Sequence, residues 1–346
     1  MLRWHDAGMD PVEALREIGF WLERERATSY RVEAFRRAAA VLAPLSAEEV
    51  ARRAERGELA RMKGIGPKSL AVVEEALAGE VPAYLADLRS RNDAPLADGG
   101  RDLRAQLRGD LHMHSDWSDG GSPIEEMVRA ARWRGREYVA LTDHSPRLTV
   151  ANGLSADRLR TQLDVVDAIN EESDDLVLLS GIEVDILEDG RLDQDDDLLD
   201  RLDVVVASVH SKLRMDRGPM TRRMIRAVEH PRTTVLGHCT GRLVEGSRGK
   251  RPESQFDAKA VFEACAANGV AVEINSRPER QDPPERLIEV ALEAGCLFAI
   301  DTDAHAPGQL DFLDYGAERA AAAGIPAERI ITAWPLDRLR AWARGS

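Results

Sequence analysis

Six of the eight histidines in this sequence stand at or just after the ends of short apolar segments. They are His112, His114, His144, His210, His238 and His305. The acids Asp119, Glu183 and Asp303 are interleaved with them, whereas His5 and His230 lie away from such segments. Burying many imidazoles and carboxylates together is costly unless cations hold them. The pattern therefore predicts metal ligands more strongly than a set of unrelated structural histidines.

The types of these side chains restrict the metal and the reaction. Imidazole and carboxylate ligands without a thiolate suit Zn, Mn or Fe. Nine candidate ligands are too many for one tetrahedral ion, so we expect two or three divalent ions that share a bridging carboxylate and keep open water positions. A hydroxide bound between such ions would attack phosphorus while the ions neutralise the developing charge. The expected chemistry is phosphoester hydrolysis.

Seven short apolar segments precede the polar residues and are predicted strands. They are residues 110–112, 138–141, 177–180, 204–208, 234–236, 270–274 and 297–300. Amphipathic helical segments lie between them, which predicts an α/β fold with a parallel sheet. One such helix, 123–134, has Ser122 and Glu125 in the spacing of a capping box. Seven units favour a closed or nearly closed barrel whose strand ends converge on one face. An open doubly wound sheet is the alternative.

The part of the chain before residue 92 is predicted to be helical. Asp10 and Pro11, followed by Glu13, are typical of a helix start. Further helices are expected up to about Pro44, over 47–56 and over 68–78. Residues 92–108 are polar and contain a Gly-Gly pair, so we interpret them as a linker with a short helical turn. The predicted domains are thus 1–91 and 109–346.

The turn before the last of these helices could bind phosphate. Its Gly-Ile-Gly sequence opens a helix and presents backbone N–H groups, with a lysine on each side. The residues are Lys63, Gly64, Ile65, Gly66 and Lys68. An ordinary helix–helix turn is an equally good interpretation. The arginines Arg31, Arg36 and Arg37 either reinforce this basic region or form a solvated helix face.

The charge of the chain is unevenly distributed. The formal net charge is −14, but residues 1–108 contain 18 basic and 18 acidic residues, so all the excess lies in 109–346. This distribution excludes broad coating of duplex DNA and allows local binding by the neutral part. Three cysteines without a CxxC pair indicate reduced thiols. With no signal sequence and no apolar run of roughly 18 residues, we expect a cytoplasmic protein without membrane contact.

The set DLHMHSDWSDG, TDHS, GIEVDI, SVHS, GHCTGR, EINSRPERQD and DTDAH resembles the polymerase and histidinol phosphatase (PHP) family. It is most similar to the PHP domain attached to bacterial family-X DNA polymerases. The resemblance implies a distorted (β/α)7 TIM-like barrel with a trinuclear Zn or Mn site. It assigns His112, His114, Glu183 and Asp303 to one ion, Glu183, His210 and His238 to a second, and Asp119, His144 and His305 to a third. It also implies that Glu183, His112 and Asp303 are catalytic through the metal-bound hydroxide. Asp119 replaces a histidine of some relatives, so the third site is expected to be weaker or to prefer Mn.

Residues from about Asp10 to Arg91 resemble the helix-hairpin-helix domain of family-X polymerases, which binds DNA ends and gaps. Only about 17 residues separate this region from the barrel, and they contain no palm motif. Polymerase activity is therefore not expected. Some relatives use a lysine of the second hairpin helix as a lyase nucleophile, but Val72 stands at the matching place here. Lyase chemistry, which needs an amine, is not expected either.

These observations favour a phosphoesterase that acts on DNA ends, gaps or single strands. A 3′–5′ exonuclease, a 3′-phosphatase and an abasic-site endonuclease all fit. Four basic residues follow strand ends and are candidates for phosphate contacts or for ion pairs at the rim: Lys212, Arg242, Arg277 and Arg280. The first alternative is a small-molecule phosphatase of the histidinol-phosphate type. The second is a DNA-binding scaffold whose metals are structural.

Overall fold

A computed structural model describes residues 9–172, 174–246 and 249–344, and the chain divides into two compact units. The first unit extends to Pro95 and includes Pro307–Gln309, and the second comprises Leu96–Ala306 and the residues from Leu310 onward. Leu103 and Leu107, in the predicted linker, are buried in the core of the second unit. The borders of the predicted domains remain a prediction.

The first unit consists of helices in its described residues. They are α1 (Pro11–Arg24), α2 (Ser29–Leu42), α3 (Ala47–Glu55), the short η1 (Leu59–Arg61), α4 (Pro67–Leu77) and α5 (Ala83–Arg91). The start predicted for the first helix is confirmed, because the side chain of Asp10 accepts a hydrogen bond from the Glu13 backbone N–H at 2.9 Å. Leu15, Leu22 and Leu59 are fully buried and close the small core.

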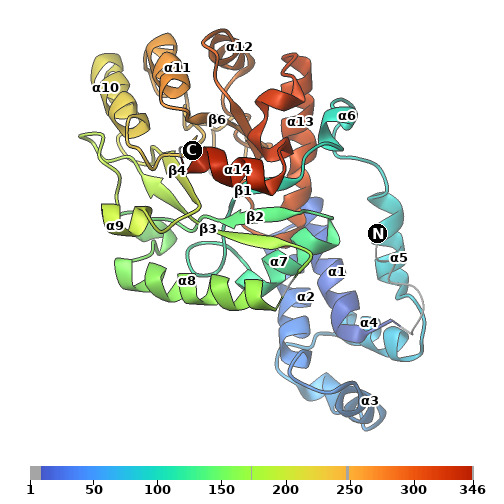
Figure 1. The fold of residues 1–346 in the computed structure, drawn as a ribbon. Helices are drawn as coiled ribbons and strands as arrows, with labels where there is room; N and C mark the ends of the chain where they lie inside the picture. The colour runs from blue at the N-terminus through green and yellow to red at the C-terminus, as the bar shows by residue number, and fades with distance from the viewer. Residues whose placement is uncertain (1–8, 173, 247–248, 345–346) are drawn as a thin grey trace. The chain divides into compact units, whose positions relative to one another are not determined.

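The second unit contains seven parallel strands in sequence order (Figure 1). They are β1 (Gly109–Met113), β2 (Tyr138–Leu141), β3 (Val177–Asp185), β4 (Val204–Ser208), β5 (Val235–Leu236), β6 (Ala271–Asn275) and β7 (Phe298–Asp301). A parallel bridge between Met113 and Ala304 joins the first strand to the chain after the last strand. The backbone N–H of His114 donates to the carbonyl of Ala304 at 2.8 Å. The sheet is therefore a nearly closed barrel, as predicted, and the open doubly wound alternative is wrong.

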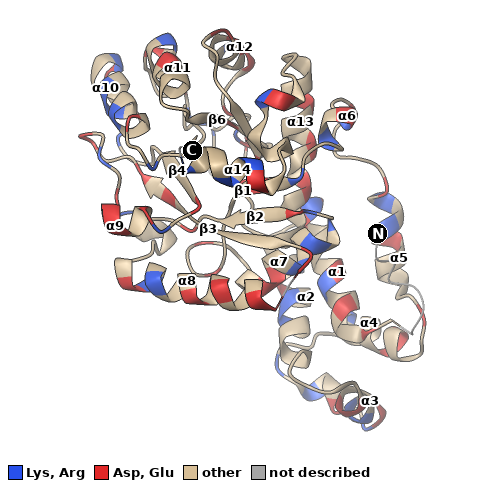
Figure 2. Ribbon diagram, in the orientation of Figure 1, with Lys and Arg blue, Asp and Glu red and all other residues tan. Residues whose placement is uncertain are grey.

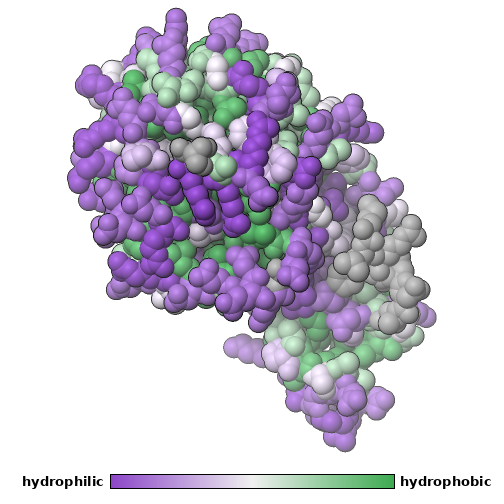
Figure 3. Space-filling view, viewed as in Figure 1, coloured by the Kyte–Doolittle hydropathy of each residue, from purple (hydrophilic) through white to green (hydrophobic). Residues whose placement is uncertain are grey.

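Helices cover the outside of this barrel. They are α6 (Arg101–Arg104), α7 (Ile124–Trp133), α8 (Ala156–Glu171), α9 (Asp196–Leu199), α10 (Arg217–Val228), α11 (Ala258–Ala267), α12 (Glu285–Glu293), α13 (Leu313–Ala322) and α14 (Leu336–Ala343), with short turns η2 (Thr149–Ala151), η3 (Pro307–Phe312), η4 (Ala327–Arg329) and η5 (Ile331–Ala333). Acidic residues colour much of α8 and α9 in Figure 2. Hydrophilic side chains cover most of the barrel face seen in Figure 3. The apolar faces of the helices are turned to the strands, where Phe262 and Phe298 are fully buried.

The third strand is longer than predicted and lies between two neighbours. Residues 177–180 pair with β2 and residues 181–185 pair with β4, while a parallel bridge between His144 and Glu183 continues the contact with the chain after β2. Gly181 lies close to both neighbours, since an added Cβ would be 2.9 Å from the Leu141 carbonyl oxygen and 3.0 Å from that of Val204. Glu183 thus lies inside a strand, and the prediction that this strand ends at residue 180 is wrong. Pairing with β4 extends β3 to Asp185, five residues beyond the apolar run from which the strand was predicted.

The predicted capping of a helix by Ser122 is also wrong. α7 begins at Ile124, its N-cap position is Pro123, and no side chain caps it. The Ser122 hydroxyl is buried without a hydrogen-bond partner, while its carbonyl accepts from the Asp116 N–H at 2.8 Å. Ser122 therefore belongs to the loop that carries Asp119. The spacing to Glu125 was right for a capping box, but the helix begins one residue later.

Two further sequence expectations concern membrane-spanning helices and the cysteine thiols. Among the described residues, no helix is both long enough and apolar enough to cross a membrane. Cys239, Cys265 and Cys296 are free and buried. Burial raises the pKa of each thiol. The cytoplasmic location remains a prediction.

We predict that Gly181→Ala lowers the stability of the barrel by roughly 1–3 kcal/mol, because the new methyl group overlaps backbone oxygens that cannot move away. Chemical denaturation followed by circular dichroism measures the change. Gly218→Ala in α10 is the control, since an added Cβ there comes no closer than 3.6 Å to the flexible end of Arg222. A Gly181→Ala variant as stable as the parent would show that β3 tolerates a side chain at this position between β2 and β4.

Candidate metal centre

Glu183 lies at the centre of a ring of imidazoles. Its carboxylate is 99% shielded from solvent, and five histidines from four other strand ends approach its two oxygens. Oε1 lies 2.8 Å from His238 Nε2 and 3.2 Å from His210 Nε2, and Oε2 lies 2.8 Å from His144 Nδ1, 3.4 Å from His112 Nε2 and 3.6 Å from His114 Nε2. The extended third strand thus brings one acid to imidazoles from four other strand ends.

The remaining predicted ligands lie on one side of this ring. Asp119 Oδ1 is 3.4 Å from His144 Nε2 and 3.3 Å from His305 Nε2. Asp303 Oδ1 is 3.5 Å from both His114 Nε2 and His305 Nδ1. The structure therefore brings all nine residues into one continuous cluster. Asp119 is the most exposed of the nine side chains, at 35%.

The cluster contains three groups of side chains close enough to share an ion. The ligand atoms in each group lie within 4.8 Å of one another. The groups are His112, His114 and Asp303; His144, Glu183 and His210; and His114, Asp119, His144 and His305. They differ from the predicted sets in three ways. Glu183 is absent from the group of His112, His114 and Asp303, His144 takes the place of His238 beside His210, and His114 and His144 each join two groups. Which residues hold which ion remains a prediction.

Unpaired buried atoms test whether these residues suit cations. Both oxygens of Glu183 are buried without a hydrogen bond, and so are ring nitrogens of His112, His114, His144, His210 and His238. These atoms approach one another at ion-pair distances, but not with the angles of hydrogen bonds. Because buried polar atoms in proteins nearly always have partners, their lone pairs suit divalent ions well. Such ions would supply Lewis-acid chemistry to a phosphate ester.

Electrostatics within the cluster fit the same conclusion. Burial would raise the pKa of Glu183, but the charges of His210, His144 and His112 outweigh burial and hold that pKa well below its usual range. Burial lowers the pKa of His144, yet Glu183 and Asp119 raise it to about 10. Burial and the neighbouring His305 and His144 keep the pKa of His114 low. The carboxylate thus favours the charged form of His144, and the rings favour the ionised form of Glu183.

Glu273 supports the cluster, although it was not among the predicted ligands. One of its oxygens lies 2.5 Å from His112 Nδ1, and the other accepts from the His238 backbone N–H at 2.5 Å. Contact with Nδ1 leaves Nε2 of His112 facing Glu183. A carboxylate behind a ligating histidine fixes the ring and raises its basicity. The sequence signal was present, because Glu273 is an acid within the otherwise apolar run of residues 270–274.

Three other buried acids hold the loops that carry ligands. Asp143 accepts hydrogen bonds from Ser115 and Gln162, which fixes the loop before Asp119. Asp110 accepts from the Thr302 N–H at 3.1 Å and from its hydroxyl at 2.5 Å. Asp185 accepts from the His210 backbone N–H at 3.1 Å. These acids stand beside predicted ligands in the sequence, and only the fold separates their supporting role from direct ligation.

The four basic candidates for phosphate contacts separate into two pairs. Arg280 Nε lies 3.0 Å from Asp303 Oδ2, and Arg277 Nη1 lies 2.9 Å from His305 Nδ1, so both adjoin the cluster. Arg242 donates to the carbonyls of Arg280 and Gln281 and so supports their loop. Lys212 is exposed and lies 4.0 Å from Glu188. Phosphate contact by these residues remains a prediction, better supported for Arg277 and Arg280.

The Gly-Ile-Gly turn forms as the sequence indicates. It connects η1 to α4, and its two lysines, Lys63 and Lys68, are exposed. Gly64 has φ +104°, and a Cβ there would lie 3.0 Å from Val41. The Ser69 hydroxyl accepts from the Gly66 N–H at 2.9 Å. DNA binding by this turn remains a prediction.

The three arginines near the turn differ in their surroundings. Arg31 donates to the Tyr84 hydroxyl at 2.7 Å. Arg36 is paired with Glu23, whereas the exposed Arg37 lies 3.8 Å from Glu33. Arg36 is therefore largely structural.

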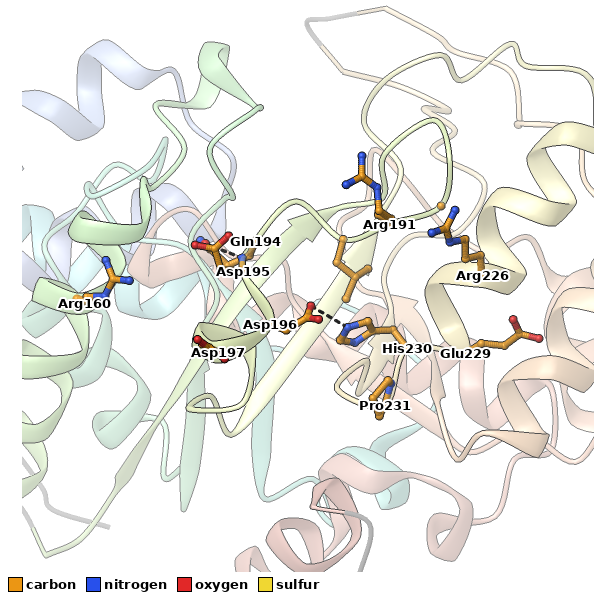
Figure 4. Close-up of a pocket in the computed structure, with 12 residues that line it drawn as sticks. Arg160, Arg191, Gln194, Asp195, Asp196, Asp197, Arg226, Glu229, His230 and Pro231 are labelled. Carbon is orange, nitrogen blue, oxygen red and sulfur yellow. Dashed lines mark hydrogen bonds and ion pairs between the residues drawn. The ribbon is translucent and has the colours of Figure 1, made fainter.

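A separate polar hollow of about 820 Å³ lies on the outside of the barrel (Figure 4). None of its lining residues is among the nine predicted ligands. His230 lies there, 3.3 Å from Asp196, and Arg191 lies 2.6 Å from Asp189. Its charged groups thus pair locally. His5 lies outside the described residues.

We predict that metal binding releases protons and weakens as the pH falls. A ring whose pKa is raised carries a proton at neutral pH in the metal-free protein and must lose it to bind a cation. Each proton released should lower the affinity about tenfold per pH unit below that pKa. Calorimetric titration with Mn²⁺ in buffers of different ionisation enthalpy measures this release. Affinity that is equal at pH 6 and pH 8 would contradict the prediction.

We also predict that Glu273→Gln weakens metal binding by roughly 10- to 100-fold, because an amide cannot accept hydrogen bonds through both of its polar atoms. Competition with a chelator gives the affinity. Glu263→Gln on the exposed face of α11 is the matched control. Unchanged affinity in the Glu273 variant would show that His112 needs no carboxylate behind it.

Comparisons with known proteins agree with this structure. Residues 110–277 match the family described as PHP domain, and residues 8–81 match the helix-hairpin-helix domain. The chain is 37% identical over 239 residues to "DNA polymerase/3'-5' exonuclease PolX" of Bacillus subtilis, a match that covers 69% of this chain and 41% of that protein. The chain therefore spans less than half the length of this relative.

Two other similar proteins are named as phosphatases. "Probable phosphatase YcdX" of Escherichia coli is 27% identical over 237 residues, which cover 65% of this chain and 90% of that protein. A crystal structure of histidinol phosphate phosphatase from Lactococcus lactis, complexed with Zn, L-histidinol and phosphate, has a TM-score of 0.46 at 17% identity and covers 64% of this chain and 95% of that one. The chain therefore contains a PHP domain over residues 110–277, preceded in the sequence by a helix-hairpin-helix domain over residues 8–81.

Proposed function

We propose that this protein is a metal-dependent phosphoesterase that hydrolyses phosphate esters at DNA ends or gaps. The observation that carries the proposal is the buried Glu183 carboxylate, whose two oxygens face five imidazoles without hydrogen bonds. Such a cluster suits two or three divalent ions, with Mn or Zn preferred for this ligand set. The helix-hairpin-helix match on the same chain supports DNA as the substrate.

The side chains around the cluster have separable tasks in this proposal. Bound ions would activate water and neutralise the phosphate oxygens. Glu183 holds the histidines of several strands around one point, and Glu273 fixes the ring of His112. Arg277 and Arg280 are largely buried beside Asp303 and His305, where planar guanidinium groups bind phosphate oxygens well. The chain itself thus offers donors on one side of the cluster.

The Gly-Ile-Gly turn would bind the DNA backbone. Exposed Lys63 and Lys68 would supply the charge for this contact. The N–H groups of Ile65 and Gly66 are bonded within the turn, to the Met62 carbonyl and the Ser69 hydroxyl, and Pro67 has none, so the lysines carry this part of the proposal. Contacts of this type place DNA without reading its sequence. Among the end-processing activities, 3′–5′ exonuclease action is favoured by the similarity to the Bacillus subtilis protein named for this activity. The 3′-phosphatase and abasic-site endonuclease activities use the same chemistry.

A small-molecule phosphatase is the second candidate. It is favoured by the Escherichia coli relative named as a probable phosphatase, of which 90% is matched by 65% of this chain. The matched 237 residues make up nearly all of that relative, so it has no long region beyond them. In this alternative the helix-hairpin-helix domain would not affect turnover.

The proposal is tested with 3′-labelled single-stranded and gapped DNA, the full chain, and added Mn²⁺ or Zn²⁺. We expect release of nucleotides or phosphate, and a loss of at least about 100-fold in His114→Ala, which removes a ligand candidate shared by two groups. Replacing Lys63 and Lys68 by Glu should raise KM roughly 10-fold with kcat nearly unchanged, because these residues would bind DNA in the ground and transition states alike. Lys259→Glu on α11 is the matched charge control.

Two results would count against DNA as the substrate. Rapid hydrolysis of histidinol phosphate with intact DNA would favour the small-molecule alternative. No hydrolysis of any phosphoester by metal-loaded protein would favour a scaffold with structural metals. An unchanged KM in the double lysine variant would remove the turn from the proposal.

A further inference from the structure

One fully buried arginine connects the backbone beside two parts of the metal cluster. Arg223 on α10 is 1% exposed and donates hydrogen bonds to the Ile186, Leu187 and Ser211 backbone, while the carboxylates of Asp185 and Glu188 act on it from beyond ion-pair distance. Its guanidinium donates only to neutral oxygens of two loops. Burying an arginine without a carboxylate partner is costly, so its contacts require an explanation.

The contacts of Arg223 lie directly beside cluster residues in the sequence. Nε donates to the carbonyls of Ile186 at 3.0 Å and Leu187 at 2.8 Å, just after the end of β3 at Asp185. Nη2 donates to the Ile186 carbonyl as well. Nη1 donates to the carbonyl of Ser211 at 2.9 Å, one residue after His210. One planar group therefore joins the exit of β3 to the exit of β4.

This connection begins where the sheet stops. The last backbone hydrogen bond between β3 and β4 runs from the Ile186 N–H to the Ser208 carbonyl at 2.7 Å. Ser208 lies two residues before His210. Beyond it, Asp185 Oδ1 accepts from the His210 N–H at 3.1 Å, and Arg223 holds Ser211. The backbone pairing of β3 with β4 thus ends before His210. The 3.2 Å distance between Glu183 Oε1 and His210 Nε2 therefore depends on the hydrogen bonds of Asp185 and Arg223 to the chain around His210.

We propose that Arg223 is a positioning residue that fixes the loop carrying His210 against the end of β3, and so sets the ion-binding group of Glu183, His210 and His144. The inference rests on the proposed metal-dependent function, but it concerns ion binding rather than the substrate. The fork of the guanidinium reaches both loops at once. A lysine has one nitrogen and can hold only one of the loops firmly.

The test measures Mn²⁺ binding to the chelator-treated full chain by calorimetry, with circular dichroism as a check of the fold. Arg223→Met should weaken binding of one ion roughly 100-fold, and Arg223→Lys roughly 10-fold, while the remaining ions bind as in the parent. Arg222→Met, on the exposed side of the same helix, is the matched control and should bind all ions normally. If Arg223→Met does not fold, Arg223→Lys decides the outcome.

A merely structural role would give a different result. In that case the Arg223 variants would melt at lower temperature, but their folded fraction would bind every ion with parental affinity, and the inference would be overturned. Equal weakening of all ions would also overturn it, because the effect would not be confined to the His210 group. Selective loss of one ion in a protein that leaves DNA intact would support the role of Arg223 and reject only the DNA substrate. A parent protein that binds no divalent ion would overturn both proposals.

Discussion

The barrel mouth depends on the neutralisation of one buried carboxylate. Glu183 is removed from water and surrounded by imidazoles from the other strand ends, and an isolated buried charge of this kind costs several kcal/mol. Protonated histidines neutralise it in the absence of ions, and divalent cations are the better partners for the same lone pairs. Because the ends of β1, β2, β4 and β5 supply the imidazoles that surround this residue of β3, closing the barrel and building the site are a single process.

The long third strand places this carboxylate. β3 lies between β2 and β4 and extends past the end of β2, so that Glu183 reaches histidines from both neighbouring sides. Behind the cluster, Glu273, Asp143 and Asp185 hold the rings and loops, and Arg223 continues the link between two strands after their ladder ends. The precision of the cluster therefore comes from residues that are not themselves ligand candidates.

The uneven charge of the chain takes on a definite meaning in this structure. Much of the acidic excess lies on α8, α9 and the loops beside them, where acidic residues are marked in Figure 2. Another part of it is the cluster itself, whose carboxylates are balanced by histidines or by ions. A net charge of −14 thus says little about the polarity near the site, where Arg277 and Arg280 are close to Asp303.

The sequence by itself determined the fold class, the parallel strands and the nine residues of the cluster. Short apolar runs ending in histidines and acids are strong local patterns, and parallel strands bring their ends to one face whatever the loops do. The length of β3, the true start of α7 and the sharing of His114 and His144 between groups were decided only by the tertiary structure. So were the supporting roles of Glu273 and Arg223, because an acid or arginine near a ligand looks the same in sequence whether it binds an ion, a phosphate or a backbone carbonyl. Only distances between strands separate these roles, and those distances arise when the barrel closes.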